Sequence, residues 1–126
     1  MSKKILVVDD EPDVVRLLTA RLHASGYEVI SAEDGLSGLE KARTEKPNLI
    51  ILDLMLPKMD GYQVCRLLKF DALTAKCPII LFTARAQEGD KQMGLDVGAD
   101  AYITKPFEPE ILLAKITELL AKTATS

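Results

Sequence analysis

Short apolar runs recur along the chain, and segments with helical spacing of apolar residues separate them. The most apolar run, 49–52, shows no polar alternation and is typical of a strand that is covered on both faces at the centre of a parallel sheet. Similar runs predict four further strands. The expected strands are 5–8, 28–32, 49–52, 79–82 and 101–103.

Helix start and stop signals fill the intervals between these strands. Pro12 suits the first turn of a helix and Asp10 its N-cap, and Gly26 ends that helix. Asp34 is expected to cap a second helix, which ends before Pro47. Spacing predicts an inward face on each strong helix, made of Val14, Leu17, Leu18, Leu22, Leu36, Leu39, Ala42, Val64, Leu67, Leu68, Leu112, Ile116, Leu119 and Leu120.

A fourth helix is expected over 87–97, and the last one over 108–122. Two glycines interrupt the segment 87–97, and an interior glycine costs roughly 1 kcal/mol relative to alanine. We therefore expect this element to be marginal and mobile. A frayed tail over 123–126 should follow the last helix.

Strand and helix alternate five times in this scheme. Such alternation demands parallel pairing with right-handed crossovers, which gives a doubly wound α/β sheet with helices on both faces. Ligands of these sheets bind at the carboxyl ends of the strands, where the strand order reverses. Polar groups follow four of the strands at that edge, namely Asp9, Asp10, Asp53, Thr83 and Lys105.

Composition narrows the class of protein. The 126 residues fit one domain, 1–126. An apolar content of 48% against 28% charged residues excludes intrinsic disorder. The apolar residues occur in short runs, none of them long enough to cross a membrane. The first residues run straight into a strand, so we expect a cytoplasmic protein with reduced Cys65 and Cys77. The net charge of −3 with scattered basic residues predicts no direct contact with nucleic acid.

The three aspartates indicate a metal site. Carboxylates so close together cannot all stay ionised unless a cation lies among them, and an all-oxygen set favours Mg²⁺, with Mn²⁺ as an alternative. Asp10 and Asp53 are the expected side-chain ligands, Asp9 could act through a bound water, and the carbonyl of Met55 could add another oxygen.

The remaining groups indicate what the cation would serve. Lys105 supplies a point charge and Thr83 a hydroxyl donor, which together match the oxygens of a tetrahedral phosphoryl group. A carboxylate is a competent nucleophile toward phosphorus. The pocket is therefore predicted to accept a phosphoryl group on Asp53.

Four motifs, 7–11, 52–61, 82–84 and 102–107, together resemble the receiver domain of two-component response regulators over essentially the whole chain. The resemblance implies a flavodoxin-like (βα)5 domain with strand order 2-1-3-4-5, phosphorylated by a sensor histidine kinase or a histidine phosphotransfer protein. It also implies residue roles: Asp53 as phosphoacceptor, Asp9 and Asp10 as the acidic metal-binding pair, Thr83 as switch hydroxyl, Tyr102 as switch aromatic and Lys105 as the phosphate-binding lysine.

The segment after the first strand distinguishes between other functions that such a sheet can have. A flavin site needs a loop rich in hydroxyls and glycines there, but residues 9–12 are Asp-Asp-Glu-Pro. A dehalogenase-type phosphatase needs its nucleophile there, a second acid two residues later and a lid domain. Here position 11 is Glu, position 12 is Pro, and the 126 residues leave no length for a lid. A receiver fold kept only for protein interaction remains open, and the intact acceptor set speaks against it.

Further expectations concern the consequences of phosphorylation. The Lys105–Pro106 peptide bond should be cis, because Lys105 must turn back over the edge of the sheet. Helix 87–97, the fifth strand and the last helix should carry the response to an unknown output protein or domain, and a phosphorylation-dependent dimer is one form it could take. Met55 and Arg85 should restrict water access, giving a long-lived phosphoryl group. The absence of a basic segment after the last helix favours a stand-alone regulator.

Overall fold

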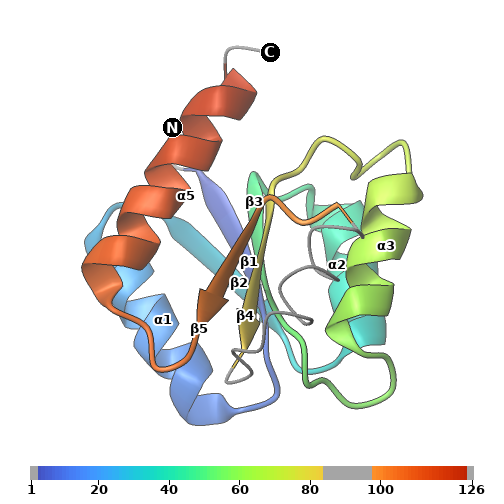
Figure 1. Cartoon of the computed structure of the whole chain (residues 1–126), viewed down its shortest axis with the longest axis horizontal. Coiled ribbons are helices and arrows are strands. Elements are labelled where there is room, and N and C mark those ends of the chain that lie inside the picture. The colour runs from blue at the N-terminus through green and yellow to red at the C-terminus, as the bar shows by residue number, and fades with distance from the viewer. Residues whose placement is uncertain (1–2, 84–97, 125–126) are drawn as a thin grey trace.

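The central strand is β3 (Leu49–Asp53), and all five of its residues are buried. In this computed structural model, residues 3–83 and 98–124 are described, without the side chains of 83, 123 and 124. Every strand pair is parallel, and the five-stranded sheet has the order β2-β1-β3-β4-β5. The predicted fold class and strand order are confirmed (Figure 1).

The other elements lie close to their predicted positions. The flanking strands are β1 (Lys4–Val8), β2 (Glu28–Ala32), β4 (Ile79–Thr83) and β5 (Ala101–Thr104). The described helices are α1 (Pro12–Ala24), α2 (Gly35–Glu45), α3 (Gly61–Phe70) and α5 (Pro109–Ala124). The helix expected over 87–97 lies outside the described residues.

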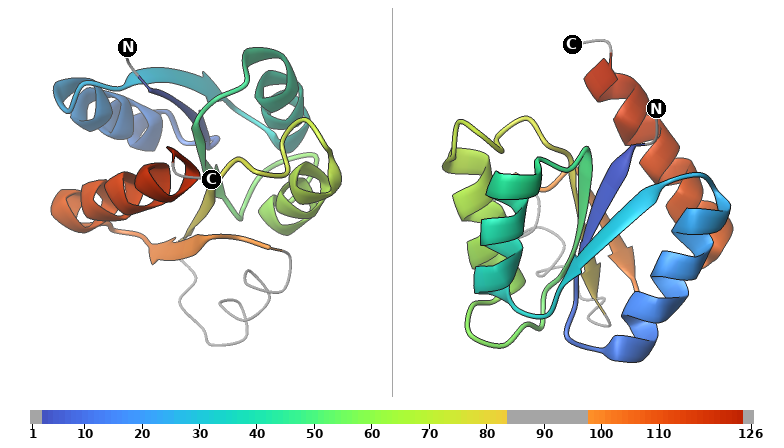
Figure 2. Two further views of the ribbon diagram at one scale, coloured as in Figure 1. Left: turned by 90° about the horizontal axis from the view of Figure 1, so that it is seen from above. Right: turned by 180° about the vertical axis from the view of Figure 1, so that it is seen from behind.

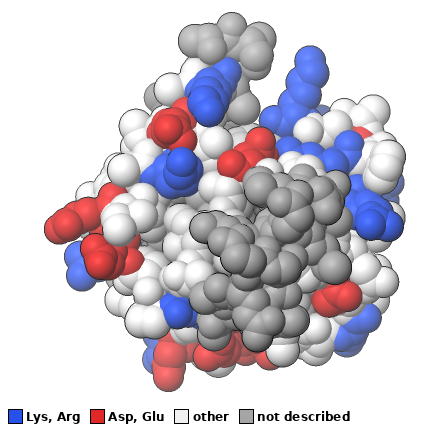
Figure 3. All heavy atoms as spheres, viewed as in Figure 1, with Lys and Arg blue, Asp and Glu red and all other residues white. Residues whose placement is uncertain are grey.

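The sheet separates two apolar layers. Helices α1 and α5 cover one face, and α2 and α3 cover the other (Figure 2). Alternate residues of each strand enter opposite layers because strand side chains have a period of two: Ile51 packs with α1 and α5, whereas Ile50 and Leu52 pack with α2 and α3. On the face seen in Figure 3, acidic and basic residues are interspersed.

Three predicted core leucines are wrong. Leu17, Leu36 and Leu67 are 50%, 51% and 46% exposed. Each helix packs only a narrow stripe of side chains against the sheet, and these three leucines lie beside that stripe, toward solvent. In α2 the close approach is made by Gly38, because a Cβ there would lie 2.9 Å from a methyl group of Val8.

The two helix caps differ in outcome. Asp34 caps α2 as predicted, since its Oδ1 accepts a 2.8 Å hydrogen bond from the backbone N–H of Ser37. At α1 the predicted Asp10 cap is wrong. Glu11 occupies the N-cap position before Pro12 and makes no side-chain cap, because its carboxylate binds elsewhere.

Two expectations about the chain's class can be compared with the structure. Cys65 and Cys77 are both thiols, as predicted. Among the described residues, no helix combines the length and the apolar character that crossing a bilayer requires.

Candidate functional site

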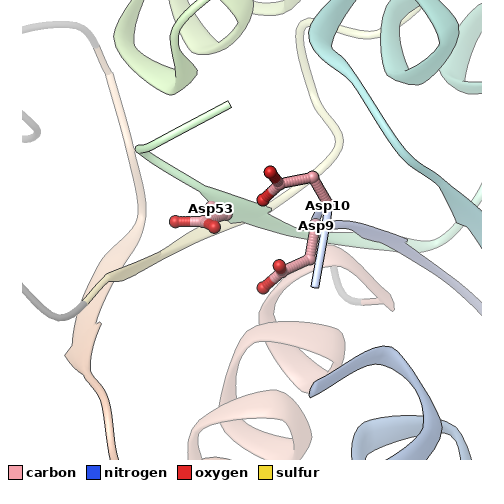
Figure 4. A group of neighbouring side chains, drawn as sticks. All are labelled: Asp9, Asp10 and Asp53. Atoms are coloured by element: carbon pink, nitrogen blue, oxygen red, sulfur yellow. The ribbon is translucent and has the colours of Figure 1, made fainter. Parts of the chain in front are cut away.

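Asp9, Asp10 and Asp53 converge at the carboxyl ends of two neighbouring strands. Asp53 is the last residue of β3, and the other two follow β1, which pairs with β3. Each offers a carboxylate oxygen, and these oxygens all lie within 4.8 Å of one another. Figure 4 shows the three side chains extending from these two strand ends.

Backbone groups fix the orientation of the two buried aspartates. Asp9 and Asp53 are each 2% exposed, whereas Asp10 faces solvent. Asp9 Oδ1 accepts a 2.9 Å hydrogen bond from the N–H of Glu11, and Asp53 Oδ1 accepts one of 3.1 Å from the N–H of Met55. Both are local bonds to the residue two positions later, a conformation that aspartate favours. In each side chain Oδ2 is left to face the site.

Lys105 extends its ammonium group among these carboxylates. Its Nζ lies 3.0 Å from Asp9 Oδ2, 3.0 Å from Glu11 Oε1 and 3.3 Å from Asp53 Oδ2. It also lies over the ring of Phe82, 5.3 Å from the ring centroid, a cation–π contact. The Lys105–Pro106 bond is cis, the isomer that the sequence predicted.

Burial and charge act against each other on the two central groups. The pKa of Asp53 is raised from 3.8 to about 6, chiefly by burial. The hydrogen bond from the Met55 N–H lowers this pKa, the negative charge of Asp9 raises it, and the positive charge of Lys105 lowers it. Burial alone would lower the pKa of Lys105, but the neighbouring carboxylates of Glu11, Asp9 and Asp53 outweigh it and raise the pKa. Lys105 is therefore charged at neutral pH.

The donor set fits a hard divalent cation. Asp9 Oδ2 is fully buried and, although Lys105 Nζ lies nearby, it accepts no hydrogen bond from the described residues. One ammonium group cannot balance three close aspartates and Glu11. Carboxylate oxygens are the ligands that Mg²⁺ prefers. A cavity of about 290 Å³ also opens beside Asp9 and Asp10, toward α1 and the end of β2, and Asp53 is not among the residues that line it.

Glycine lets the loop after β3 fold back under Asp53. A Cβ on Gly61 would lie 2.4 Å from the carbonyl oxygen of Asp53, so no larger residue fits there. The Gly61 N–H donates to the carbonyl of Leu54 at 3.1 Å. This closure holds Met55 beside the site, and its side chain is 59% exposed.

The structure places some of the predicted site residues together, and others have side chains outside the described residues. Asp9, Asp10, Asp53 and Lys105 come together as expected. The backbone of Thr83 ends β4 and pairs with Thr104 of β5, but the Thr83 side chain and the whole of Arg85 lie outside the described residues. Tyr102 is half-buried on β5 and packs against the layer under α2 and α3.

Glu11 is the residue whose contact the sequence did not predict. It stands next to the acidic pair in the sequence, but its hydrogen bond to Lys105 joins positions 94 residues apart. The sequence offered one indication of this contact: Glu11 is an acidic residue at the start of α1, on the same edge of the sheet as the lysine that follows the fifth strand.

Comparison with known proteins identifies the family. The response regulator receiver domain model matches residues 5–117. The chain is 52% identical over 122 residues to the alkaline phosphatase synthesis transcriptional regulatory protein PhoP of Bacillus subtilis, covering 97% of this chain and 50% of PhoP. It is 46% identical over 120 residues to the DNA-binding dual master transcriptional regulator RpaA of Synechocystis, covering 95% of this chain and 50% of RpaA.

Solved structures agree with this match. A CheY-like response regulator receiver domain protein from Methanospirillum hungatei superposes with a TM-score of 0.93 at 34% identity, covering 99% of this chain and 98% of that one. The chain spans about half the length of the curated relatives it matches. Because those relatives are transcriptional regulators, and RpaA is named as DNA-binding, the expectation of no nucleic-acid contact is not confirmed. The chain belongs to the response regulator receiver domain family and is a phosphoacceptor module of two-component signal transduction.

Proposed function

We propose that Asp53 is the phosphoacceptor and that it takes its phosphoryl group from a phosphohistidine on a sensor kinase or a histidine phosphotransfer protein. In this step an Asp53 carboxylate oxygen forms a bond to phosphorus, the phosphorus–nitrogen bond breaks, and the imidazole leaves and takes up a proton. The observation that most supports this proposal is the buried carboxylate of Asp53 at the end of β3, with Lys105 Nζ 3.3 Å from its Oδ2. Loss of solvation makes this carboxylate a better nucleophile than an exposed one.

Asp9, Asp10 and Asp53 would hold Mg²⁺, with Mn²⁺ as a substitute and the carbonyl of Met55 as a further oxygen donor. Asp9 Oδ2 supports this set, because it is buried and accepts no hydrogen bond from the described residues although it faces Lys105. When bound, the cation neutralises charge on the transferring phosphoryl group. The protein's own part is to orient the Asp9 and Asp53 carboxylates through the backbone N–H groups of Glu11 and Met55.

Lys105 would bind an oxygen of the transferred phosphoryl group, and Thr83 would donate its hydroxyl to another. The ammonium group is prepared for this role because Phe82 supports it beside Asp53. Movement of Thr83 toward the phosphoryl group would leave space for Tyr102, which lies on the neighbouring strand. The result is a shift in population between two arrangements of one fold.

The response would be passed to an output partner through residues 87–97, β5 and α5. Relatives that this chain matches over half their length are transcriptional regulators, which supports an output domain or protein that acts on transcription. Under this proposal, phosphorylation changes the affinity of the surface for that partner or for a second receiver domain.

Labelling with a small acyl phosphate donor and Mg²⁺ tests the assignment. We expect one phosphoryl group per chain in the wild type and none in Asp53→Asn. Asp13→Asn is the matched control, because Asp13 is an exposed aspartate that pairs with Arg16 and does not belong to the cluster of Asp9, Asp10 and Asp53, and it should label normally. Labelling that survives Asp53→Asn, or that proceeds in excess chelator, would contradict the proposal.

A further inference from the structure

We propose that Glu11 is a positioning residue that takes the Lys105 ammonium group away from Asp9 and Asp53 when a divalent cation binds to them. This inference rests on the proposed metal site and adds a role for a residue outside the ligand set. In the structure Lys105 Nζ is shared by Asp9, Glu11 and Asp53 at 3.0, 3.0 and 3.3 Å.

Lys105 and the cation would compete for the same oxygen atoms. Asp9 Oδ2 and Asp53 Oδ2 both face the ammonium group, and both residues belong to the group of carboxylates that could hold a metal. A divalent cation and an ammonium group repel each other at such distances. Binding of the cation therefore requires Lys105 to weaken its contact with the two buried aspartates.

Among the described residues, Glu11 is the one carboxylate partner of Lys105 that lies outside this competition. Its side chain is 60% exposed, compared with 1% and 3% for the side chains of Asp9 and Asp53, so it can follow the ammonium group without a change in the core. It also makes no side-chain cap on α1, which leaves its carboxylate available to Lys105.

Neutralising Glu11 should therefore weaken cation binding through Lys105. Without the Glu11 carboxylate, the ammonium group stays with Asp9 and Asp53 and opposes the cation more strongly. For an exposed ion pair we expect Glu11→Gln to reduce Mg²⁺ affinity about two- to fivefold. Glu33→Gln is the matched control, since Glu33 is an exposed acid that lines the cavity beside Asp9 and Asp10 and is not among the carboxylates that pair with Lys105 in the described part of the chain.

Titration calorimetry with Mg²⁺ on the wild type, Glu11→Gln, Glu33→Gln, Lys105→Met and Glu11→Gln/Lys105→Met tests this coupling. Lys105→Met should bind Mg²⁺ more tightly than the wild type, and in that background Glu11→Gln should have no larger effect than Glu33→Gln. The ε-carbon resonance of Lys105 should also shift on addition of Mg²⁺ in the wild type, and less in Glu11→Gln.

The outcomes separate the two proposals. If the wild type binds no Mg²⁺, the metal site itself is wrong. If it binds, but Glu11→Gln weakens binding no more than Glu33→Gln or equally with and without Lys105, the metal site stands and the role of Glu11 is overturned. Should Lys105→Met fail to fold, the comparison of the two glutamate variants and the Lys105 resonance still decide the question.

Discussion

Two lysine–carboxylate clusters lie at opposite ends of the same sheet and differ in how well their polar groups are satisfied. At the amino ends of β4 and β5, Lys69 Nζ lies 3.0 Å from Asp100 Oδ2 and donates to the carbonyl of Cys77 at 2.9 Å. Asp100 Oδ2 also accepts a 2.8 Å hydrogen bond from the N–H of Ile79. One positive charge meets one negative charge here, and backbone groups complete the network.

At the carboxyl ends the balance is different. Among the described residues, Lys105 is the one cation paired with Asp9, Glu11 and Asp53, and none of the described residues donates a hydrogen bond to Asp9 Oδ2. Buried polar groups are normally satisfied, and the exceptions require an explanation. The cluster around Lys69 has its polar groups satisfied without a ligand and stabilises the fold. The cluster around Lys105 has more acceptors than donors and is suited to bind a cation.

The largest expected effect concerns the complete cluster. Lys69→Met keeps much of the apolar stem but leaves the carbonyl of Cys77 without its lysine donor, so the free energy of unfolding should fall by about 1–3 kcal/mol. Urea unfolding measures this loss, and phosphorylation at saturating donor should be unchanged. Lys115→Met removes an exposed lysine paired with Glu118 and should change stability little. Equal stability of the two variants, or loss of labelling in Lys69→Met, would break the comparison.

At the cluster around Lys105, the second prediction is a substitution that stabilises the fold. Asp53→Asn should raise the free energy of unfolding by about 2 kcal/mol at pH 7 in the presence of chelator, because it removes a buried charge and keeps an acceptor for the Met55 N–H. Urea unfolding of both proteins across pH provides the measurement.

The pH dependence of that difference follows from the raised pKa of Asp53. The folded state holds the proton up to about pH 6, but the unfolded state releases it near 3.8. Wild-type stability from this group is therefore fully present below the unfolded pKa and is lost as pH rises through the folded pKa. The advantage of Asp53→Asn should grow over the same interval. A difference that is constant with pH would show that Asp53 is not desolvated as described.

A smaller effect is expected on the lifetime of the phosphoryl group. Met55 cannot orient a water molecule as an amide can, and the sequence predicts the same for Arg85, so the phosphorylated form should be long-lived for this family. The double variant Met55→Asn/Arg85→Glu should lose label about tenfold faster, below the range of a fully positioned general base. Met55→Leu, which stays apolar, is the control. Equal rates of label loss would remove these side chains from the account.

The smallest effect should be a redistribution of structure. On addition of a phosphoryl mimic, amide NMR shifts should concentrate in residues 87–97, β5 and α5, because phosphorylation is expected to shift a population and not to create a new fold. The amino-end cluster around Lys69 should show little change. Shifts confined to α1 and α2 would contradict the predicted output surface.

The sheet and the aspartate cluster were predictable because both depend on local pattern. An unbroken apolar run such as 49–52 is typical of a buried strand, and parallel strands bring their carboxyl ends to one edge of the sheet. The resemblance to receiver domains implied that the first and third strands are neighbours, which brings Asp9 and Asp53 together. The cis bond before Pro106 followed from the same local reasoning.

What the sequence did not predict depends on how elements pack. Leu17 and Leu67 have helical spacing suited to the core, but burial is decided by how α1 and α3 are rotated on the sheet. Gly38 brings α2 close to Val8 in place of the expected Leu36, which depends on the distance between layers. The Glu11–Lys105 contact likewise requires knowledge of how far the loop after β5 reaches across the sheet.

Chemical mapping of the phosphorylated residue tests the central claim most directly. Borohydride reduces an acyl phosphate on an aspartate side chain to an alcohol, and peptide mass spectrometry then locates the modified position. After phosphorylation in Mg²⁺, we predict a single reduced aspartate at Asp53, absent in excess chelator and absent in Asp53→Asn. A reduced residue at Asp9, Asp10 or any other acid, or modification at Asp53 that does not depend on the cation, would contradict the account.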